Sequence, residues 1–226
     1  MTVGQAIGEL LPLAIGIAIS PAPIIAVILM LITPQARSNG LAFLGGWVLG
    51  LAVVGAIVLI IANTAGIAES SGPSKTVSTI KLILGLLLLF AAFRQWRKRP
   101  KAGEEAPLPK WMKALDGFTP GKALAAGALL SGVNPKNLIL NATAAAGIAQ
   151  AGLSGAQQTV ALIVLVVVGS LSIIAPVGVY LGMGDKAGHI LDGWKTWLAA
   201  NNATVMVVLF LVFGVSLVGK GIGGLS

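Results

Sequence analysis

Several stretches of this chain are apolar over the full length that a helix needs to cross a membrane. Residues 41–62 and 159–181, for example, contain no Asp, Glu, Lys or Arg. A helical span takes about 20 apolar residues, and only helices and closed barrels satisfy all their backbone hydrogen bonds in lipid. A barrel would instead show segments of about ten residues with alternating polarity. The uninterrupted stretches therefore predict an all-α membrane protein.

The composition and the charge agree with a chain surrounded by lipid. Hydrophobic residues make up 56% of the 226 residues and charged residues only 10%, whereas soluble domains carry about 25% charged residues. The net charge of +8 comes mainly from one connecting segment, as the positive-inside rule expects of a cytoplasmic loop. We therefore expect membrane lipids as partners and no nucleic acid. The chain has no cysteine, which excludes disulfides and thiolate sites.

Six spans are predicted, three on each side of a basic linker. They cover residues 10–32, 41–62, 76–93, 123–148, 159–181 and 203–218, and the linker covers residues 94–122. Residues 183–202 alternate charged and apolar side chains, which predicts an amphipathic helix lying in the membrane interface. With the N-terminus outside, eleven of the 15 Lys and Arg residues fall in inner segments and three in outer ones. This bias predicts a cytoplasmic linker and two extracytoplasmic termini.

Two proline-containing breaks interrupt the first and the fourth span. The first is residues 20–23 (Ser-Pro-Ala-Pro), and the second is residues 134–137 (Asn-Pro-Lys-Asn). A proline in a helix interior costs about 3 kcal/mol, and a lysine at the bilayer centre costs about 2.5–3.5 kcal/mol. Ionisable groups retained at such a cost usually serve a function. We interpret the two breaks as facing each other in the working site of a transporter.

Each half of the chain begins with a broken span and continues with two unbroken ones. Because three is an odd number, the second half enters from the opposite side, which is the plan of inverted repeats. Pro21 and Pro135 each lie 11 residues beyond Leu10 and Leu124. At about 1.5 Å per residue, both breaks come about 16 Å deep in a core roughly 30 Å thick. The sequence thus predicts six transmembrane helices as two inverted repeats, residues 1–93 and 123–226.

These features together resemble the lysine exporter superfamily, whose members pair a proline motif in the first helix with an Asn-Pro-Lys-like motif in the fourth. Residues 20–50, the basic linker and residues 134–147 are most similar to its GAP branch. That branch comprises the glycopeptidolipid- and sulfolipid-1-addressing proteins of mycobacteria and other actinobacteria. The resemblance implies an exporter in the bacterial plasma membrane that acts on a lipid-linked or glycolipid substrate. It also allows a homodimer, because superfamily members can dimerise.

The two breaks supply the candidate substrate-binding residues, and a half-helix N-terminus beside Lys136 would suit a phosphate, sulfate or carboxylate. Alternatively, Lys136 extends its stem toward an interface, the Asn side chains only satisfy the broken backbone, and the prolines are static kinks. Glu9, near the outer end of the first span, is a candidate for proton coupling or a plain interfacial residue. The candidate substrate-binding residues are Ser20, Pro21, Pro23, Asn134, Pro135, Lys136, Asn137 and Asn141.

No pattern for catalysis or for a metal site occurs in the sequence. The chain has one histidine, no cysteine and no pair of carboxylates within the spans, so we expect no enzyme activity, no metal and no cofactor. Two other functions stay open beside the lipid exporter. One is a secondary exporter of amino acids or other small metabolites. The other is a non-transporting membrane scaffold of a lipid-assembly complex, whose breaks would pack dry against neighbouring helices.

Overall fold

The computed structural model describes residues 1–64, 75–97 and 118–225, and all the regular elements in these ranges are helices. The predicted all-α fold is confirmed for this part of the chain. Most of the predicted linker lies outside the described residues. The helices are α1 (Val3–Ala18), α2 (Pro21–Leu31), α3 (Ala36–Thr64), α4 (Lys75–Arg97), α5 (Pro120–Gly132), α6 (Pro135–Gln150), α7 (Gly155–Met183), the short 3₁₀ helix η2 (Gly184–Ala187) and α8 (Gly188–Gly223).

The helix starts follow from local side-chain chemistry. Thr2 and Ser154 cap α1 and α7, and in each case a glutamine three residues later bonds back to the cap amide. This reciprocal arrangement satisfies two backbone donors that the first helical turn leaves open. Helices α2, α5 and α6 each have a proline in the first turn, where its missing N–H needs no partner. The prolines thus start new helices at the breaks.

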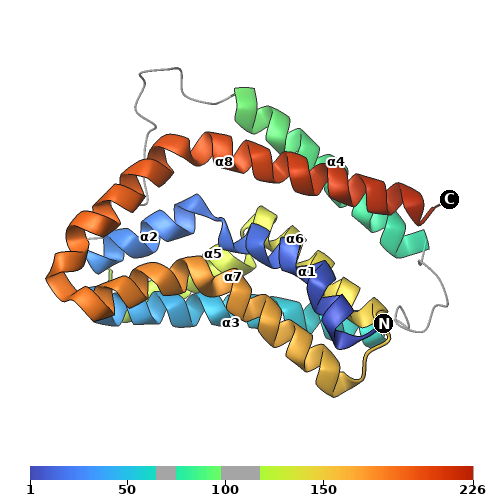
Figure 1. Ribbon diagram of the computed structural model, residues 1–226, viewed down its shortest axis with the longest axis horizontal. Helices are drawn as coiled ribbons and strands as arrows, with labels where there is room; N and C mark the ends of the chain where they lie inside the picture. The colour runs from blue at the N-terminus through green and yellow to red at the C-terminus, as the bar shows by residue number, and fades with distance from the viewer. Residues whose placement is uncertain (65–74, 98–117, 226) are drawn as a thin grey trace.

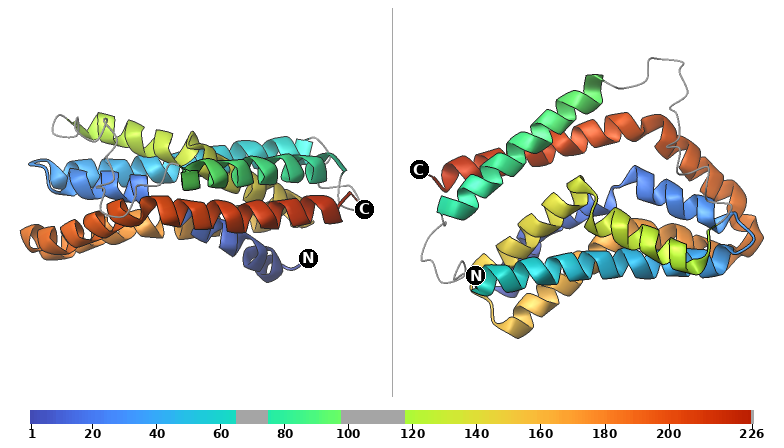
Figure 2. Two further views of the ribbon diagram at one scale, coloured as in Figure 1. Left: turned by 90° about the horizontal axis from the view of Figure 1, so that it is seen from above. Right: turned by 180° about the vertical axis from the view of Figure 1, so that it is seen from behind.

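The helices form a main group and a separate pair. Helices α4 and α8 lie side by side along one edge, and the remaining helices form the rest of the molecule (Figures 1 and 2). In the main group, α1 packs on α6 and α7, and α3 packs on α5, α6 and α7. The first part of α8 bends around the far end of the molecule toward α2 and α7 (Figure 1). Both chain ends lie at the opposite end (Figure 1).

Glycines allow the backbones of two helix pairs to approach closely. A Cβ on Gly46 of α3 would stand 1.9 Å from the Leu124 carbonyl oxygen of α5. A Cβ on Gly85 of α4 would stand 2.7 Å from the Val218 amide of α8. Small residues have this role in lipid, where packing drives helix association. Neither of these two helix contacts was predicted from the sequence.

Four helices are long and apolar enough to cross a membrane: α3, α4, α7 and α8. Helices α1 and α2 form a fifth candidate span, bent by 54° at the break between them. Helices α5 and α6 have 13 and 16 residues, so each is short of the length of a span. A multi-pass membrane protein is supported, while the sixth span and the inverted repeat stay predictions. Large apolar side chains such as Phe90 and Val215 are more than 60% exposed, as lipid-facing residues would be.

The predicted amphipathic segment and the predicted last span belong to one helix. Helix α8 runs without interruption through 36 residues, so residues 188–202 continue directly into residues 203–218. Trp194 and Trp197 are exposed on this first part, and Lys195 pairs with Asp192 one turn before it. Helix α8 has no interior proline that would separate the two parts. The change of direction is instead a bend within α8 (Figure 1).

Candidate functional site at two helix breaks

The first break leaves the carbonyl end of α1 inside the molecule without the backbone donors of a next helical turn. Helix α1 ends at Ala18, Ile19 and Ser20 leave the helical conformation, and α2 begins at Pro21. The last carbonyl groups of a helix have no partner within it and carry a partial negative charge. Neither Pro21 nor Pro23 has an N–H to offer them. The carbonyls of α1 therefore need donors from elsewhere.

Lys136 from the second break supplies donors to two of these carbonyls. Its Nζ donates to the carbonyl oxygens of Gly16 at 2.6 Å and Ile19 at 2.9 Å, and to Ser20 Oγ at 2.7 Å. An ammonium group has three N–H donors, so all of them are used. Only 4% of Lys136 is exposed. The side chain is a buried cation that caps the C-terminal end of α1 rather than one that extends to an interface.

Two serines complete the set of donors around α1. Ser20 Oγ lies 2.7 Å from the Ile17 carbonyl oxygen, and Ser172 of α7 donates to the Ala18 carbonyl oxygen at 2.5 Å. Ser172 was not among the predicted site residues. The only signal available for it was a pair of serines, Ser170 and Ser172, in an otherwise apolar span. Every carbonyl from Gly16 to Ile19 thus accepts a hydrogen bond from a side chain.

The second break is held by asparagine side chains. Asn134 Oδ1 accepts from the backbone N–H of Lys136 at 3.0 Å and so caps α6. Asn137 Nδ2 donates to the Leu130 carbonyl oxygen near the end of α5 at 3.1 Å. Asn137 Oδ1 lies 3.2 Å from Ser20 Oγ and so joins the two breaks. These contacts agree with the alternative in which the amides satisfy the broken backbone.

Asn141 connects the second break to α3. Its Nδ2 donates to the Leu51 carbonyl oxygen at 2.9 Å. Its Oδ1 is buried and, among the described residues, has no hydrogen-bond partner. A Cβ on Gly55 would stand 3.1 Å from that oxygen.

Of the predicted residues, the structure brings Ser20, Lys136 and Asn137 into contact across the two breaks. Pro135 is exposed. Ser20, Lys136 and Asn137 are at most 4% exposed, so the junction of the breaks is closed in this conformation. The Phe213 ring of α8 covers it from one side, because its atoms lie 2.4 Å from where a Cβ on Gly16 would stand. Glu9 instead lines a separate cavity near the chain ends.

The Lys136 ammonium could exchange its acceptors at the end of α1 for the oxygens of a ligand. The Lys136 ammonium now binds neutral carbonyls and one hydroxyl. Because the ammonium is charged, these bonds are already stronger than bonds between neutral groups, but an anion would add the attraction between two full opposite charges, which is large where water is excluded. An anion that reached Lys136 would therefore compete well with the end of α1. The same exchange would remove the hydrogen bonds by which Lys136 ties α6 to α1.

Comparison with known proteins places this geometry in a family. The family model described as Sap, sulfolipid-1-addressing protein, matches residues 10–223. The chain belongs to this family. The matched range includes both breaks, so the Sap family shares the part of the chain in which Lys136 meets α1. No curated protein and no solved structure matches the chain. The predicted GAP-branch resemblance is confirmed at the level of this family, and membership of the lysine exporter superfamily stays a prediction.

Proposed function

We propose that this protein translocates an anionic, amphipathic lipid of the sulfolipid or glycolipid class across the membrane. The observation that carries the proposal is the capping of α1 by Lys136. A single buried cation joins the two broken helices, and its partners are neutral groups that an anion can replace. The Sap family name supports a lipid that bears a sulfate group. A sulfate offers oxygens suited to an ammonium group.

Exchange at Lys136 would couple substrate binding to helix movement. In the closed conformation, Lys136 ties α6 to α1 through Gly16 and Ile19. When a sulfate or phosphate oxygen takes the ammonium, those two carbonyls lose their donor. The separation of α1 from α6 then costs less, and the breaks give each half-helix a hinge. Such broken helices near the bilayer midplane are typical of transporters that alternate access.

A membrane scaffold is the second candidate, because the breaks are packed dry. Ser20 and Asn137 are at most 2% exposed, and all three donors of Lys136 have protein partners. In a scaffold these contacts would be permanent. Lys136 would then stabilise the fold and move no substrate. A secondary exporter of amino acids or other small metabolites stays a further alternative, which the same assay can address.

Transport by reconstituted vesicles tests the proposal. The full chain is placed in vesicles with a fluorescent sulfated glycolipid, and the fraction that crosses the bilayer is measured with a membrane-impermeant quencher. We expect the wild-type chain to accelerate crossing and Lys136→Met to reduce the rate to that of empty vesicles. Lys186→Met, which removes an exposed charge far from the breaks, should transport normally.

Two results would overturn the proposal. If the wild-type chain moves no sulfated, phosphorylated or glycosylated lipid, the proposed transport is wrong and the scaffold function is favoured. If it exports labelled amino acids from the vesicle lumen instead, the small-metabolite exporter is correct. Rates are compared for equal amounts of folded protein, measured by size-exclusion chromatography, because Lys136→Met also removes hydrogen bonds from the core.

A further inference from the structure

A cavity separate from the breaks lies between the main helix group and the α4–α8 pair. Its volume is about 180 Å³, which is room for several water molecules. Met1 at the start of the chain and Lys220 near the end of α8 both line it. The cavity therefore lies at the end of the molecule that holds both termini. We name it the vestibule.

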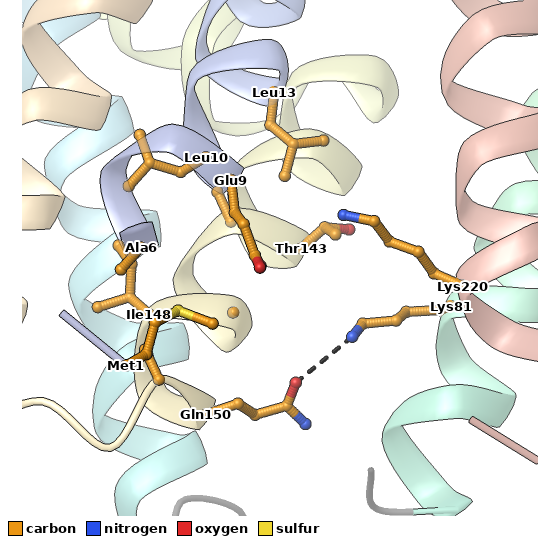
Figure 3. A pocket seen from close by; sticks show the side chains of 13 residues that line it. Met1, Ala6, Glu9, Leu10, Leu13, Lys81, Thr143, Ile148, Gln150 and Lys220 are labelled. Atoms are coloured by element: carbon orange, nitrogen blue, oxygen red, sulfur yellow. Dashed lines mark hydrogen bonds between the residues drawn. The ribbon is translucent and has the colours of Figure 1, made fainter. Parts of the chain in front are cut away.

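Polar groups face one another across the vestibule. Lys81 and Lys220 enter from α4 and α8, and Glu9, Thr143 and Gln150 enter from α1 and α6 (Figure 3). Lys81 Nζ donates to Gln150 Oε1 at 3.4 Å. Among the residues that the structure describes, neither lysine forms an ion pair with Glu9. Two cations thus face one carboxylate, and the vestibule carries a net positive charge.

Helix packing holds the two cations near each other. A Cβ on Gly221 would stand 2.8 Å from the Leu82 amide, so the residues next in sequence, Lys220 and Lys81, lie on backbones in close contact. Both side chains line the same cavity. Like charges at short range repel, and the repulsion grows where water is partly excluded. An anion bound between them would offset this cost.

One wall of the vestibule is apolar. Leu10, Leu13 and Ile148 line it on the side of α1 and α6 (Figure 3). One turn beyond Leu13 along α1, Phe213 packs against Gly16. The vestibule therefore combines two ammonium groups with an adjoining apolar surface. This combination suits a molecule that has an anionic head and a hydrocarbon tail.

We propose that the vestibule binds a sulfate or phosphate group through Lys81 and Lys220. The Gln150 amide lies within reach of the same anion. Glu9 opposes its binding and limits how tightly it is held. This inference rests on the proposed function, since it supplies the site where the substrate's anionic head is held at the end of the molecule near both termini. The same chemistry could come from the headgroup of a lipid or from a free ion.

Binding measured without transport tests the vestibule by itself. The purified full chain in detergent is titrated with a short-chain sulfated glycolipid, with phosphatidic acid, with phosphatidylcholine and with inorganic sulfate, using microscale thermophoresis. We expect the double variant Lys81→Gln/Lys220→Gln to bind the two anionic lipids about 30-fold more weakly. The matched double variant Lys75→Gln/Lys186→Gln removes the same charge outside the vestibule and should bind as the wild type does.

Glu9→Gln gives a test of opposite sign. Removing this carboxylate leaves both lysines in place, so we expect anionic lipids to bind about fivefold more tightly. If the loss of Lys81 and Lys220 weakens the binding of the lipids but not of inorganic sulfate, the vestibule is a site for lipid headgroups. If it weakens the binding of inorganic sulfate equally, the vestibule is a general oxyanion site. Both results support the proposal.

The vestibule proposal would be overturned if the two double variants bound the anionic lipids equally weakly. It would also be overturned if the wild-type chain bound phosphatidylcholine as tightly as the anionic lipids. Failure of transport with this binding intact would reject the proposed function and leave the vestibule standing. Transport without lysine-dependent binding would reject the vestibule as a binding site and leave the proposed function standing.

Discussion

Lys136 has a structural role, which is to cap α1, and a proposed chemical role, which is to bind an anion. Its ammonium fills the acceptors at the end of α1, where a cation is favoured because the helix dipole places negative charge there. The same burial makes it costly to leave that cation or its acceptors without partners. A ligand that withdraws Lys136 must therefore stabilise the ammonium at least as well as α1 does. An anion meets this condition more readily than a neutral ligand, because it adds the attraction of a full opposite charge.

Neutralising Lys136 should therefore destabilise the protein as well as stop transport. Lys136→Met keeps the length of the side chain but leaves the carbonyls of Gly16 and Ile19 without their donor. Each buried acceptor left unpaired costs about 1–3 kcal/mol. We expect a lower midpoint of thermal unfolding in detergent, followed by circular dichroism. Lys186→Met, at an exposed position, should unfold at the wild-type temperature. Equal midpoints for the two variants would contradict the capping role.

The cap of α6 gives a second measurement at this scale. Asn134→Ala removes the acceptor for the Lys136 amide, and loss of such a cap costs about 0.5–2 kcal/mol. Asn134→Ser keeps an oxygen that can accept the same hydrogen bond. We therefore expect the unfolding midpoint to fall for the alanine variant and to recover most of the way for the serine variant. A serine variant as unstable as the alanine variant would show that Asn134 acts other than as a cap.

The α3–α5 pair depends on glycines at one face of α3. Gly46 faces the backbone of α5, and Gly50 faces Ser131 and Ala128 in the same helix. Gly45 has nothing within 4 Å of its would-be Cβ. Because the fixed part of the contact at Gly46 is a carbonyl oxygen and not a flexible side chain, added volume must separate the two helices. Neighbouring glycines in the sequence thus have opposite tolerance to substitution.

Alanine at these two positions should have effects of opposite sign. Gly46→Ala forces α5 away from α3, and overpacking of this kind costs about 1–3 kcal/mol. Gly45→Ala adds a methyl group in open space and gains about 0.5–1 kcal/mol of helix propensity. The measurement is the midpoint of unfolding by a denaturing detergent. Similar midpoints for the two variants would mean that α3 and α5 do not touch at Gly46.

At the scale of the whole molecule, the orientation of the chain can be tested because it has no cysteine. Single cysteines at Thr2, Gly224 and Lys186 can be labelled with a membrane-impermeant maleimide. The structure has both chain ends at one end of the molecule and η2 at the other (Figure 1). We expect the first two variants to react in intact cells and Lys186→Cys only after permeabilisation. Labelling of the two termini from opposite sides would contradict this arrangement.

The sequence predicted the location of the site better than its contacts. Prolines and amides are conspicuous in apolar spans, and counting residues put both breaks at one depth, where Lys136 and Ser20 now meet. The partners of Lys136 could not be predicted, because two of them are backbone carbonyls, which every residue has. The glycines of α3 were visible, but choosing between Gly45 and Gly46 needs the position of α5. The cavity beside Glu9 depends on how α4 and α8 pack, which no local pattern indicated.

The capping of α1 by Lys136 also affects how the protein is made. Gly16 precedes Lys136 by 120 residues, and ribosomes add about 5–20 residues per second. The first helix therefore waits on the order of 10 seconds for the donor that its carbonyls need. Its other distant donor, Ser172, is made later still. During synthesis the first break therefore lacks its distant hydrogen-bond donors until much of the second half has been made.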